Sequence, residues 1–279
     1  MIVAQVFSLE TVTDGRRKFI VADMNTFVHK YNRVTIEKRH LYEIIREDFP
    51  CRLYFDLEFA RKENPSVDGN ALTLQWLGLV LWKIRNVFGI YLGFENVVDL
   101  DSSTEEKFSK HVTFIIPNQH HMGEKGTSGN CSGKREWGGG TGGSSDWTES
   151  SKYYAYSMVQ RDKECEEILF RNNLEVGSFV YSIVNDLLEE GRGERGVEAN
   201  DDTVETRKCD HPKAEYAHFW TQKNGKPSFF VDLGVYTRNR AFRLFSSCKF
   251  GKEVYASFSP PLLIQNLICF RKLSFSSCK

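Results

Sequence analysis

The chain has 279 residues, of which 41% are hydrophobic and 27% are charged, so it can bury a full core and is not disordered throughout. Basic and acidic residues number 37 each, which gives a formal net charge of zero. Binding to a polyanion would therefore depend on a local basic patch. The longest strongly apolar run, residues 77–82, is far shorter than the roughly 20 residues that span a bilayer. We therefore expect a soluble protein without a membrane partner.

The cysteines and the N-terminal sequence bear on the cellular compartment. Seven cysteines are scattered along the chain without a C-x-x-C pair. This pattern is typical of reduced intracellular thiols, so we predict no disulfides. The first ten residues, MIVAQVFSLE, lack a basic region followed by an apolar one, so we expect no secretory signal.

The N-terminal region is expected to form strands. Residues 4–9 and 18–22 are β-type segments on either side of Asp14-Gly15, which favours a hairpin turn. Residues 51–59 alternate between apolar and other side chains. This alternation predicts a half-buried strand with acidic residues on its open face.

Later elements follow the same periodicity arguments. Apolar residues recur at helical spacing over 77–88 and 176–188, which predicts two amphipathic helices. Gly191 is a candidate C-cap for the second helix. Residues 108–116 and 229–236 are expected to be strands.

Two stretches interrupt this order. Residues 117–167 are rich in Gly, Ser, Lys and Glu, so we expect a disordered insertion there. Residues 191–210 are charged and are expected to form a mobile loop. Phe-Ser-Ser-Cys-Lys occurs at 245–249 and again at 275–279. We accordingly divide the chain into an N-terminal part of a core (1–116), an insertion (117–167), the remainder of the core (168–252) and a divergent tail (253–279).

Three acidic residues are the candidates for chemistry. Asp56 and Glu58 are two residues apart on one strand face, about 6.6 Å along the strand, where they could share divalent cations. Asp232 lies in another apolar segment. Three such carboxylates suit a two-metal phosphoryl or nucleotidyl transfer site. The alternatives are a solvated strand face for the first two and a turn cap before Gly234 for Asp232.

Two further features suit phosphate binding. Ser109 and His111 alternate onto one strand face and could donate to phosphate oxygens, although a strand histidine is usually structural. Residues 233–252 contain five basic residues and no acid. Arginine binds phosphate bidentately, so this segment could neutralise a triphosphate. The alternative is an ordinary solvated edge strand. The basic residues are Arg238, Arg240, Arg243, Lys249 and Lys252.

Three runs carry a resemblance to a known family. They are Leu-Tyr-Phe-Asp-Leu-Glu-Phe at 53–59, Leu-Asp-Ser-Ser-Thr-Glu-Glu-Lys-Phe-Ser-Lys-His at 100–111, and Phe-Val-Asp-Leu-Gly-Val-Tyr-Thr-Arg-Asn-Arg-Ala-Phe-Arg-Leu at 230–244. With D-x-E, S-x-H and an apolar residue before Asp in this order, the chain resembles the eukaryotic primase-polymerases of the archaeo-eukaryotic primase superfamily. The resemblance covers roughly residues 4–116, 168–190 and 228–252.

The resemblance implies a role for each matching residue. Asp56, Glu58 and Asp232 match the catalytic acids that hold Mn²⁺ or Mg²⁺. Ala241 stands where some members have a polar side chain. The residues that match nucleotide-contacting positions are Arg17, Lys107, Ser109, His111, Asn239, Arg240, Arg243 and Lys249.

The resemblance also implies a fold and an activity. The expected fold is α+β, a primase-like core with a mixed sheet and flanking helices in two packed modules. The expected activity is template-dependent transfer of nucleotides from dNTPs or NTPs to a 3′-hydroxyl. The family acts in repriming and damage tolerance at stalled forks, in the nucleus and the mitochondrion, and we expect a monomer that binds template and primer DNA.

The chain also departs from the family pattern. Members continue into a zinc-binding module and an acidic segment that contacts a single-strand-binding protein, and neither is found before Lys279. Cys209 and His211 are only two ligands and do not make a tetrahedral zinc site. We therefore expect a truncated form that has no zinc site and extends primers more readily than it starts chains.

Two other functions stay open. A 3′–5′ exonuclease also has D-x-E on an apolar strand, but it would leave Ser109, His111 and the arginines without a role. The other alternative is a truncated inactive chain that binds nucleotides or single strands without turnover.

Overall fold

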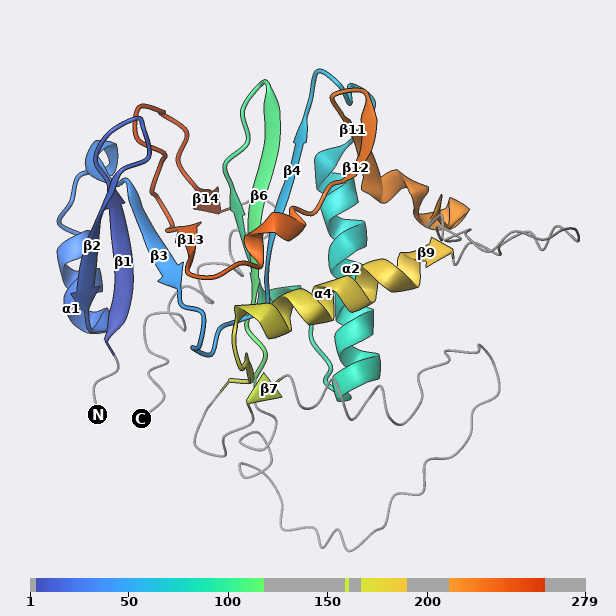
Figure 1. Ribbon diagram of the computed structural model, residues 1–279, viewed down its shortest axis with the longest axis horizontal. Helices are drawn as coiled ribbons and strands as arrows, with labels where there is room; N and C mark the ends of the chain where they lie inside the picture. Colours follow the sequence, from blue (N-terminus) through green and yellow to red (C-terminus); the bar gives the residue numbers. More distant parts are fainter. Residues whose placement is uncertain (1–3, 118–158, 161–166, 190–210, 259–279) are drawn as a thin grey trace, which may run out of the picture.

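The computed structural model describes residues 4–117, 159–160, 167–189 and 211–258 (Figure 1). Most of the predicted insertion, all of the predicted 191–210 loop and residues 259–279 of the tail lie outside these residues. The helices among them are α1 (Met24–Tyr31), α2 (Gly69–Phe88) and α4 (Asn173–Leu187), with short 3₁₀ turns η1 (Ile36–Lys38), η2 (Phe94–Asn96), η4 (Ala214–Phe219) and η5 (Leu233–Val235). The strands are β1 (Gln5–Glu10), β2 (Arg17–Ala22), β3 (Leu41–Ile45), β4 (Tyr54–Ala60), β5 (Val97–Asp101), β6 (Lys107–Phe114), β7 (Val159–Gln160), β8 (Leu169–Phe170), β9 (Leu188–Glu189), β10 (His211–Pro212), β11 (Trp220–Lys223), β12 (Lys226–Phe229), β13 (Arg240–Arg243) and β14 (Ser257–Phe258).

One four-stranded sheet has the order β13-β3-β1-β2. The predicted N-terminal hairpin is confirmed, since β1 pairs with β2 from Gln5–Ala22 to Glu10–Arg17. One face of the sheet packs on α1, where Phe7 stacks on Phe27. β13 joins this sheet from far along the chain by pairing with β3. The segment rich in arginine is therefore an edge strand, and the sheet stands at the left of Figure 1.

The second four-stranded sheet has the order β14-β5-β6-β4 and contains the predicted acidic strand. The odd-numbered residues of β4 face α2. There the ring of Phe55 on β4 meets the ring of Trp76 on α2 edge-on. α2 begins at the cap Asp68, whose side chain accepts from the backbone N–H groups of Asn70 and Ala71. It ends at Gly89, whose φ of +68° suits a left-handed C-cap.

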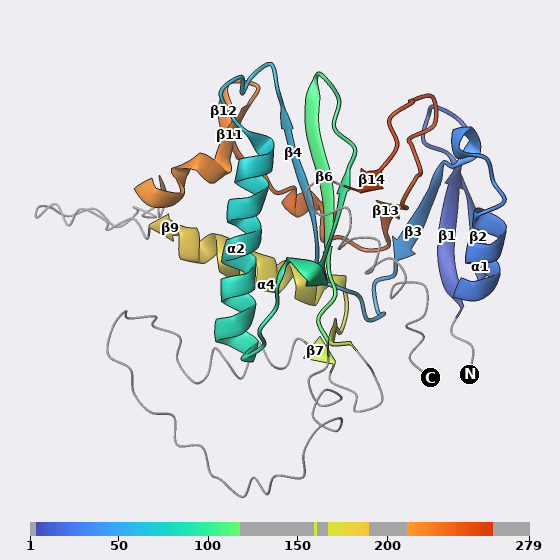
Figure 2. The same cartoon turned by 180° about the vertical axis from the view of Figure 1, so that it is seen from behind.

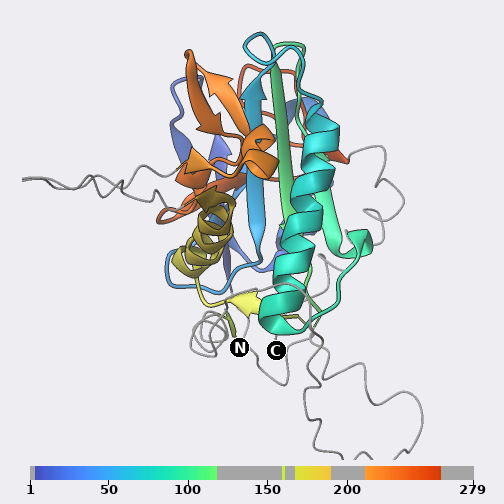
Figure 3. The same cartoon turned by 90° about the vertical axis from the view of Figure 1, so that its right-hand side faces the viewer.

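The main core fills the space between β4, β6 and the two long helices. Figures 2 and 3 show α2 and α4 together on one side of β4 and β6, with the other four-stranded sheet away from them. Val80, Ile84 and Phe179 are among its fully buried members. No helix in the described part of the chain is long and apolar enough to cross a membrane.

The fold is α+β, as expected, but three expectations were wrong. The acidic sheet is antiparallel at every pairing among the described residues, not mixed. Residues 229–236 do not form one strand: β12 ends at Phe229, and after a bridge at Val231 the chain turns into η5. α4 ends at Leu187 rather than near Gly191, because the chain becomes extended and pairs as β9 with β10.

Candidate active site

The face of β4 that points away from α2 carries the first two acids. β4 pairs with β6 so that Asp56 lies opposite His111 and Glu58 lies opposite Ser109. Lys107 follows in the same register opposite Ala60. Because side chains two residues apart share a face of a strand, the acids and the predicted phosphate-binding residues of β6 form one surface.

The third acid reaches this surface from a segment that continues the sheet beyond β4. Val231 bridges Leu57, and the backbone N–H of Asp232 donates to the carbonyl of Asp56 at 2.8 Å. The Asp232 side chain accepts from the Gly234 N–H at 2.9 Å and caps η5. The turn-cap interpretation of Asp232 is therefore correct, and the same geometry puts this residue beside the D-x-E strand.

Asp56 is the most strongly perturbed acid of the site. Burial raises its pKa to about 7, and the charges of Glu58 and Asp232 add to the shift. Its Oδ1 atom is buried and has no hydrogen-bond partner among the described residues. The His111 Nε2 atom is 3.7 Å away from it. A buried carboxylate among like charges is stabilised by a cation, and carboxylate oxygens suit Mg²⁺ or Mn²⁺.

The other two acids have partners of their own. Glu58 forms an ion pair with Lys107, while Asp232 is held by the Gly234 N–H. Within the described residues, no group of three or more His, Cys, Asp or Glu side chains is close enough to hold a metal ion. The donor set and the unpartnered Asp56 oxygen suit a divalent cation.

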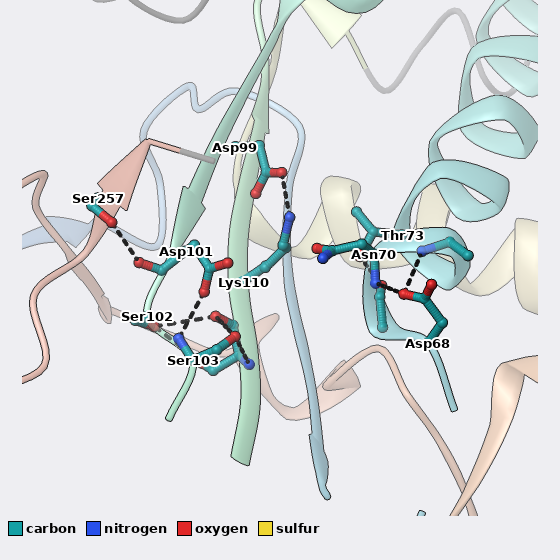
Figure 4. A network of polar contacts seen from close by, with 12 residues as sticks. Asp68, Asn70, Thr73, Asp99, Asp101, Ser102, Ser103, Lys110 and Ser257 are labelled. Carbon is teal, nitrogen blue, oxygen red and sulfur yellow. Dashed lines mark hydrogen bonds and ion pairs between the residues drawn. The ribbon is translucent and has the colours of Figure 1, made fainter. Parts of the chain in front are cut away.

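Ser109 is held by two serines at the end of β5. Ser102 Oγ lies 3.2 Å from Ser109 Oγ, and the Ser109 N–H donates to Ser103 Oγ at 3.0 Å. Figure 4 shows Ser102 and Ser103 beside Asp101, which accepts from the Ser103 N–H. On the same strands Lys110 forms a buried ion pair with Asp99. These contacts fix the Ser109 backbone next to Glu58.

His111 is neutral over the physiological pH range. Burial, together with the nearby charges of Arg243, Lys107 and Arg240, lowers its pKa to about 3. Its ring lies 4.8 Å from the ring of Phe242, which β13 contributes from the other sheet. A neutral imidazole can donate through one nitrogen and accept through the other.

β13 brings two arginines toward this surface. Arg240 and Arg243 both influence the pKa of His111, and Arg240 also acts on Asp56. Their Nε atoms are buried and have no hydrogen-bond partner among the described residues. The guanidinium groups therefore keep donors that an anion could use. Ala241, also on β13, is paired with Ile44 of β3.

The remaining predicted residues lie farther out. Arg17 is exposed on β2 and stacks over the Tyr42 ring at 4.5 Å; the charge of Arg243 also acts on Tyr42. Asn239 has a positive φ of 49°, and its side chain accepts from the Glu47 N–H. Lys249 is exposed, and no hydrogen bond or ion pair joins its side chain to the acids within the described chain.

Sequence reasoning missed two buried asparagines that support the site. Asn173 accepts from the Tyr54 hydroxyl and donates to the carbonyls of Val235 and Thr237, which anchors the chain after Asp232. Asn64 bonds to Ala60 and Gln222 and so ties the end of β4 to β11. A lone asparagine gives no sequence signal for partners such as Gln222 or Thr237, which lie far away along the chain.

Comparison with known proteins bears on this geometry. No family model matches the chain. It is 32% identical over 257 residues to a zebrafish (Danio rerio) protein named DNA-directed primase/polymerase protein, covering 89% of this chain and 40% of that protein. The human protein of this name is 32% identical over 289 residues, with 89% and 43% covered. The chicken (Gallus gallus) protein is 30% identical over 291 residues, with 89% and 42% covered.

The chain is a homologue of the DNA-directed primase/polymerase proteins. The resemblance read from the three motifs is thereby confirmed. The chain spans about two fifths of the length of these curated relatives. The match to these relatives covers 89% of this primase/polymerase homologue, so the relationship does not depend on the acidic motifs alone.

Proposed function

We propose that the chain transfers nucleotides from dNTPs or NTPs to the 3′-hydroxyl of a primer on a DNA template. The observation that carries the proposal is the shared surface of β4 and β6. It combines the buried Asp56 carboxylate, whose Oδ1 has no hydrogen-bond partner among the described residues, with Ser109 and His111, and β13 adds arginines. The names of the relatives support DNA as the template and nucleotides as the substrates.

We assign the cation site to Asp56, Glu58 and Asp232. Two Mn²⁺ or Mg²⁺ ions bound there would supply charge neutralisation and a more acidic attacking hydroxyl. The proposal is supported by the effect of Glu58 and Asp232 on Asp56, because the charges of both raise its pKa. It is also supported by the chemistry of the donors, which are all hard oxygen ligands.

The remaining residues would bind and orient the triphosphate. His111, being neutral, can donate one hydrogen bond to a phosphate oxygen without adding a positive charge next to the cations. Ser109 is positioned beside it by Ser102 and Ser103. Arg240, Arg243 and Lys107 would neutralise the phosphates; Arg17, Asn239 and Lys249 are assigned to the nucleotide by the family resemblance alone.

The reaction itself is a displacement at the α-phosphorus. The 3′-oxygen forms a bond to phosphorus, the bond from phosphorus to the bridging oxygen breaks, and pyrophosphate leaves. The hydroxyl proton passes to solvent. Positioning and charge neutralisation are the main contributions a protein makes to such a reaction. The wider role we propose is repriming and damage tolerance in the nucleus, with the mitochondrion as a second location.

Extension of a labelled primer tests the function. Wild-type protein with dNTPs and Mn²⁺ should lengthen the primer by templated residues, and Asp56→Ala with Glu58→Ala should abolish lengthening while the thermal unfolding transition remains. Glu37→Ala, at an exposed acid of η1 that does not line the groove beside the acids, is the matched control and should retain activity. Shortening of the primer would favour the exonuclease alternative. Binding without incorporation by folded wild-type protein would favour the inactive alternative, and an unprimed template tests priming.

A further inference from the structure

A groove adjoins the acids on the side of the β11–β12 hairpin. Its volume is about 1170 Å³, and it is lined by the end of β4, the turn between β5 and β6, and the hairpin itself. Glu58 and Asp232 lie on its wall together with Lys62, Lys223 and Ser228. The acids are therefore accessible from this groove.

The strand order gives the groove a defined place relative to the proposed nucleotide. Ser109 and His111 lie on β6, the first two acids lie on the neighbouring β4, and the Val231 bridge continues the sheet beyond β4. The groove includes this last segment, from Val231 to Gly234. In a phosphoryl displacement the attacking and leaving oxygens are roughly in line. With the leaving phosphates at Ser109 and His111, which do not line the groove, an in-line displacement puts the attacking hydroxyl on the groove side of the acids.

The hairpin wall of the groove is held firmly. Asn224 and Gly225 both have positive φ, 53° and 71°, as a tight two-residue hairpin turn requires. Asn64 makes hydrogen bonds to Gln222 N and O and to Ala60 O, and it is only 6% exposed. The Gly225 N–H also donates to Glu63. The hairpin is thereby fixed to the same strand that carries the acids.

The groove is lined by charges of both signs, and the lysines at its hairpin side are the ones open to phosphates. Lys62 and Lys223 are exposed, and neither takes part in an ion pair among the described residues. Glu105, Glu106 and Lys107 line the groove from the β5–β6 side, where Lys107 pairs with Glu58, and Glu63 lines it beside Lys62. Arg61 is already engaged, since its Nε donates to the Thr104 carbonyl. A backbone of regularly spaced phosphates would therefore contact the two lysines.

We propose that this groove binds the DNA strand that ends in the attacking 3′-hydroxyl, with its phosphates on Lys62 and Lys223. The inference rests on the proposed nucleotidyl transfer and specifies where the primer lies. Asn64 is then a positioning residue that keeps the hairpin wall aligned with the acids.

Equilibrium binding distinguishes contacts to the primer from contacts to the template. The affinity of a fluorescent template is measured with and without an annealed primer, at several salt concentrations, for wild type and for Lys62→Ala with Lys223→Ala. The added affinity that the primer gives should be lost in the double variant. The salt slope should fall by about two for the primed DNA and stay unchanged for the template alone, because each lysine–phosphate contact contributes about one.

Lys226→Ala is the control, because Lys226 pairs with Lys223 on the hairpin but does not line the groove. It should behave as wild type. The proposal is overturned if wild type binds primed and unprimed DNA equally, or if the double variant loses both affinities alike or neither. Wild-type protein that incorporates no nucleotide yet shows the lysine-dependent primer affinity would contradict the proposed function and leave the groove assignment standing.

Discussion

Asp56 has a pKa that makes the stability of the metal-free protein depend on pH. Its pKa is about 7 in the folded chain, against an ordinary value of 3.8 for an aspartate in water, so the folded chain binds the proton more tightly. The stabilising contribution from protonated Asp56 is therefore fully present below pH 3.8, and it is lost as the pH rises through about 7. A shift of this size corresponds to at most about 4 kcal/mol. The causes are burial and two neighbouring carboxylates, so a bound cation should relieve the same cost.

We predict that Asp56→Asn stabilises the protein at pH 8 in the presence of a chelator. The variant removes the buried charge and keeps the side-chain shape, so its free energy of unfolding should exceed that of wild type by about 1–4 kcal/mol. The difference should disappear near pH 4. Denaturant unfolding at both pH values measures it.

Added Mn²⁺ should then raise the stability of wild type relative to the variant. At 100 times the dissociation constant a ligand stabilises the folded state by about 2.7 kcal/mol, and this gain should appear in wild type alone. A variant that is less stable than wild type at pH 8 without metal, or one that gains equally from Mn²⁺, would contradict the electrostatic account of Asp56.

At the scale of elements, α2 and α4 are joined by a polar contact within an otherwise apolar interface. Lys83 on α2 is 1% exposed and forms an ion pair with Asp186 on α4 at 2.5 Å. Burial lowers the pKa of Lys83, and the aspartate opposes this shift. Lys213 also donates to the Asp186 carbonyl, which brings the chain after α4 to the same place.

We predict that Asp186→Ala is more destabilising than Lys83→Met. The first variant deprives a buried ammonium of its carboxylate and should lower the free energy of unfolding by about 1–3 kcal/mol. This is less than for a fully buried pair, because the Asp186 side chain is 38% exposed. The second removes the charge and keeps an unbranched side chain, so the loss should be smaller. Urea denaturation compares them, and a larger loss in Lys83→Met would contradict this account.

The elements also show how far sequence patterns reach. The D-x-E strand, the first hairpin and the two helices follow from local periodicity, and the acids' common face follows from the spacing of two. The 229–236 segment misled because Phe230 is buried and Phe229 partly buried in the main core, although the chain makes only a single bridge to β4, at Val231, before it turns into η5. β13 could not be placed, because its partner β3 lies almost 200 residues earlier and the sequence does not encode that pairing locally.

At the scale of the whole molecule, the candidate site depends on both four-stranded sheets. The acids, Ser109 and His111 belong to one sheet, while Arg240 and Arg243 lie on the edge strand of the other. Phe242 links them by packing on His111 and on Tyr54. Catalysis by this arrangement would require the two sheets to be correctly packed, so each activity assay needs a check of folding.

Asp232→Asn tests the central claim most directly. An asparagine oxygen can still accept from the Gly234 N–H and cap η5, so the substitution removes the charge and retains the local structure. The measurement is single-turnover incorporation of one templated dNMP with Mn²⁺ by folded wild type and variant. We predict incorporation by wild type and a loss of at least about 100-fold in the variant, roughly the size of removing one strong transition-state interaction. Equal rates in the two proteins would contradict the assignment of Asp232, with Asp56 and Glu58, to a nucleotidyl-transfer centre.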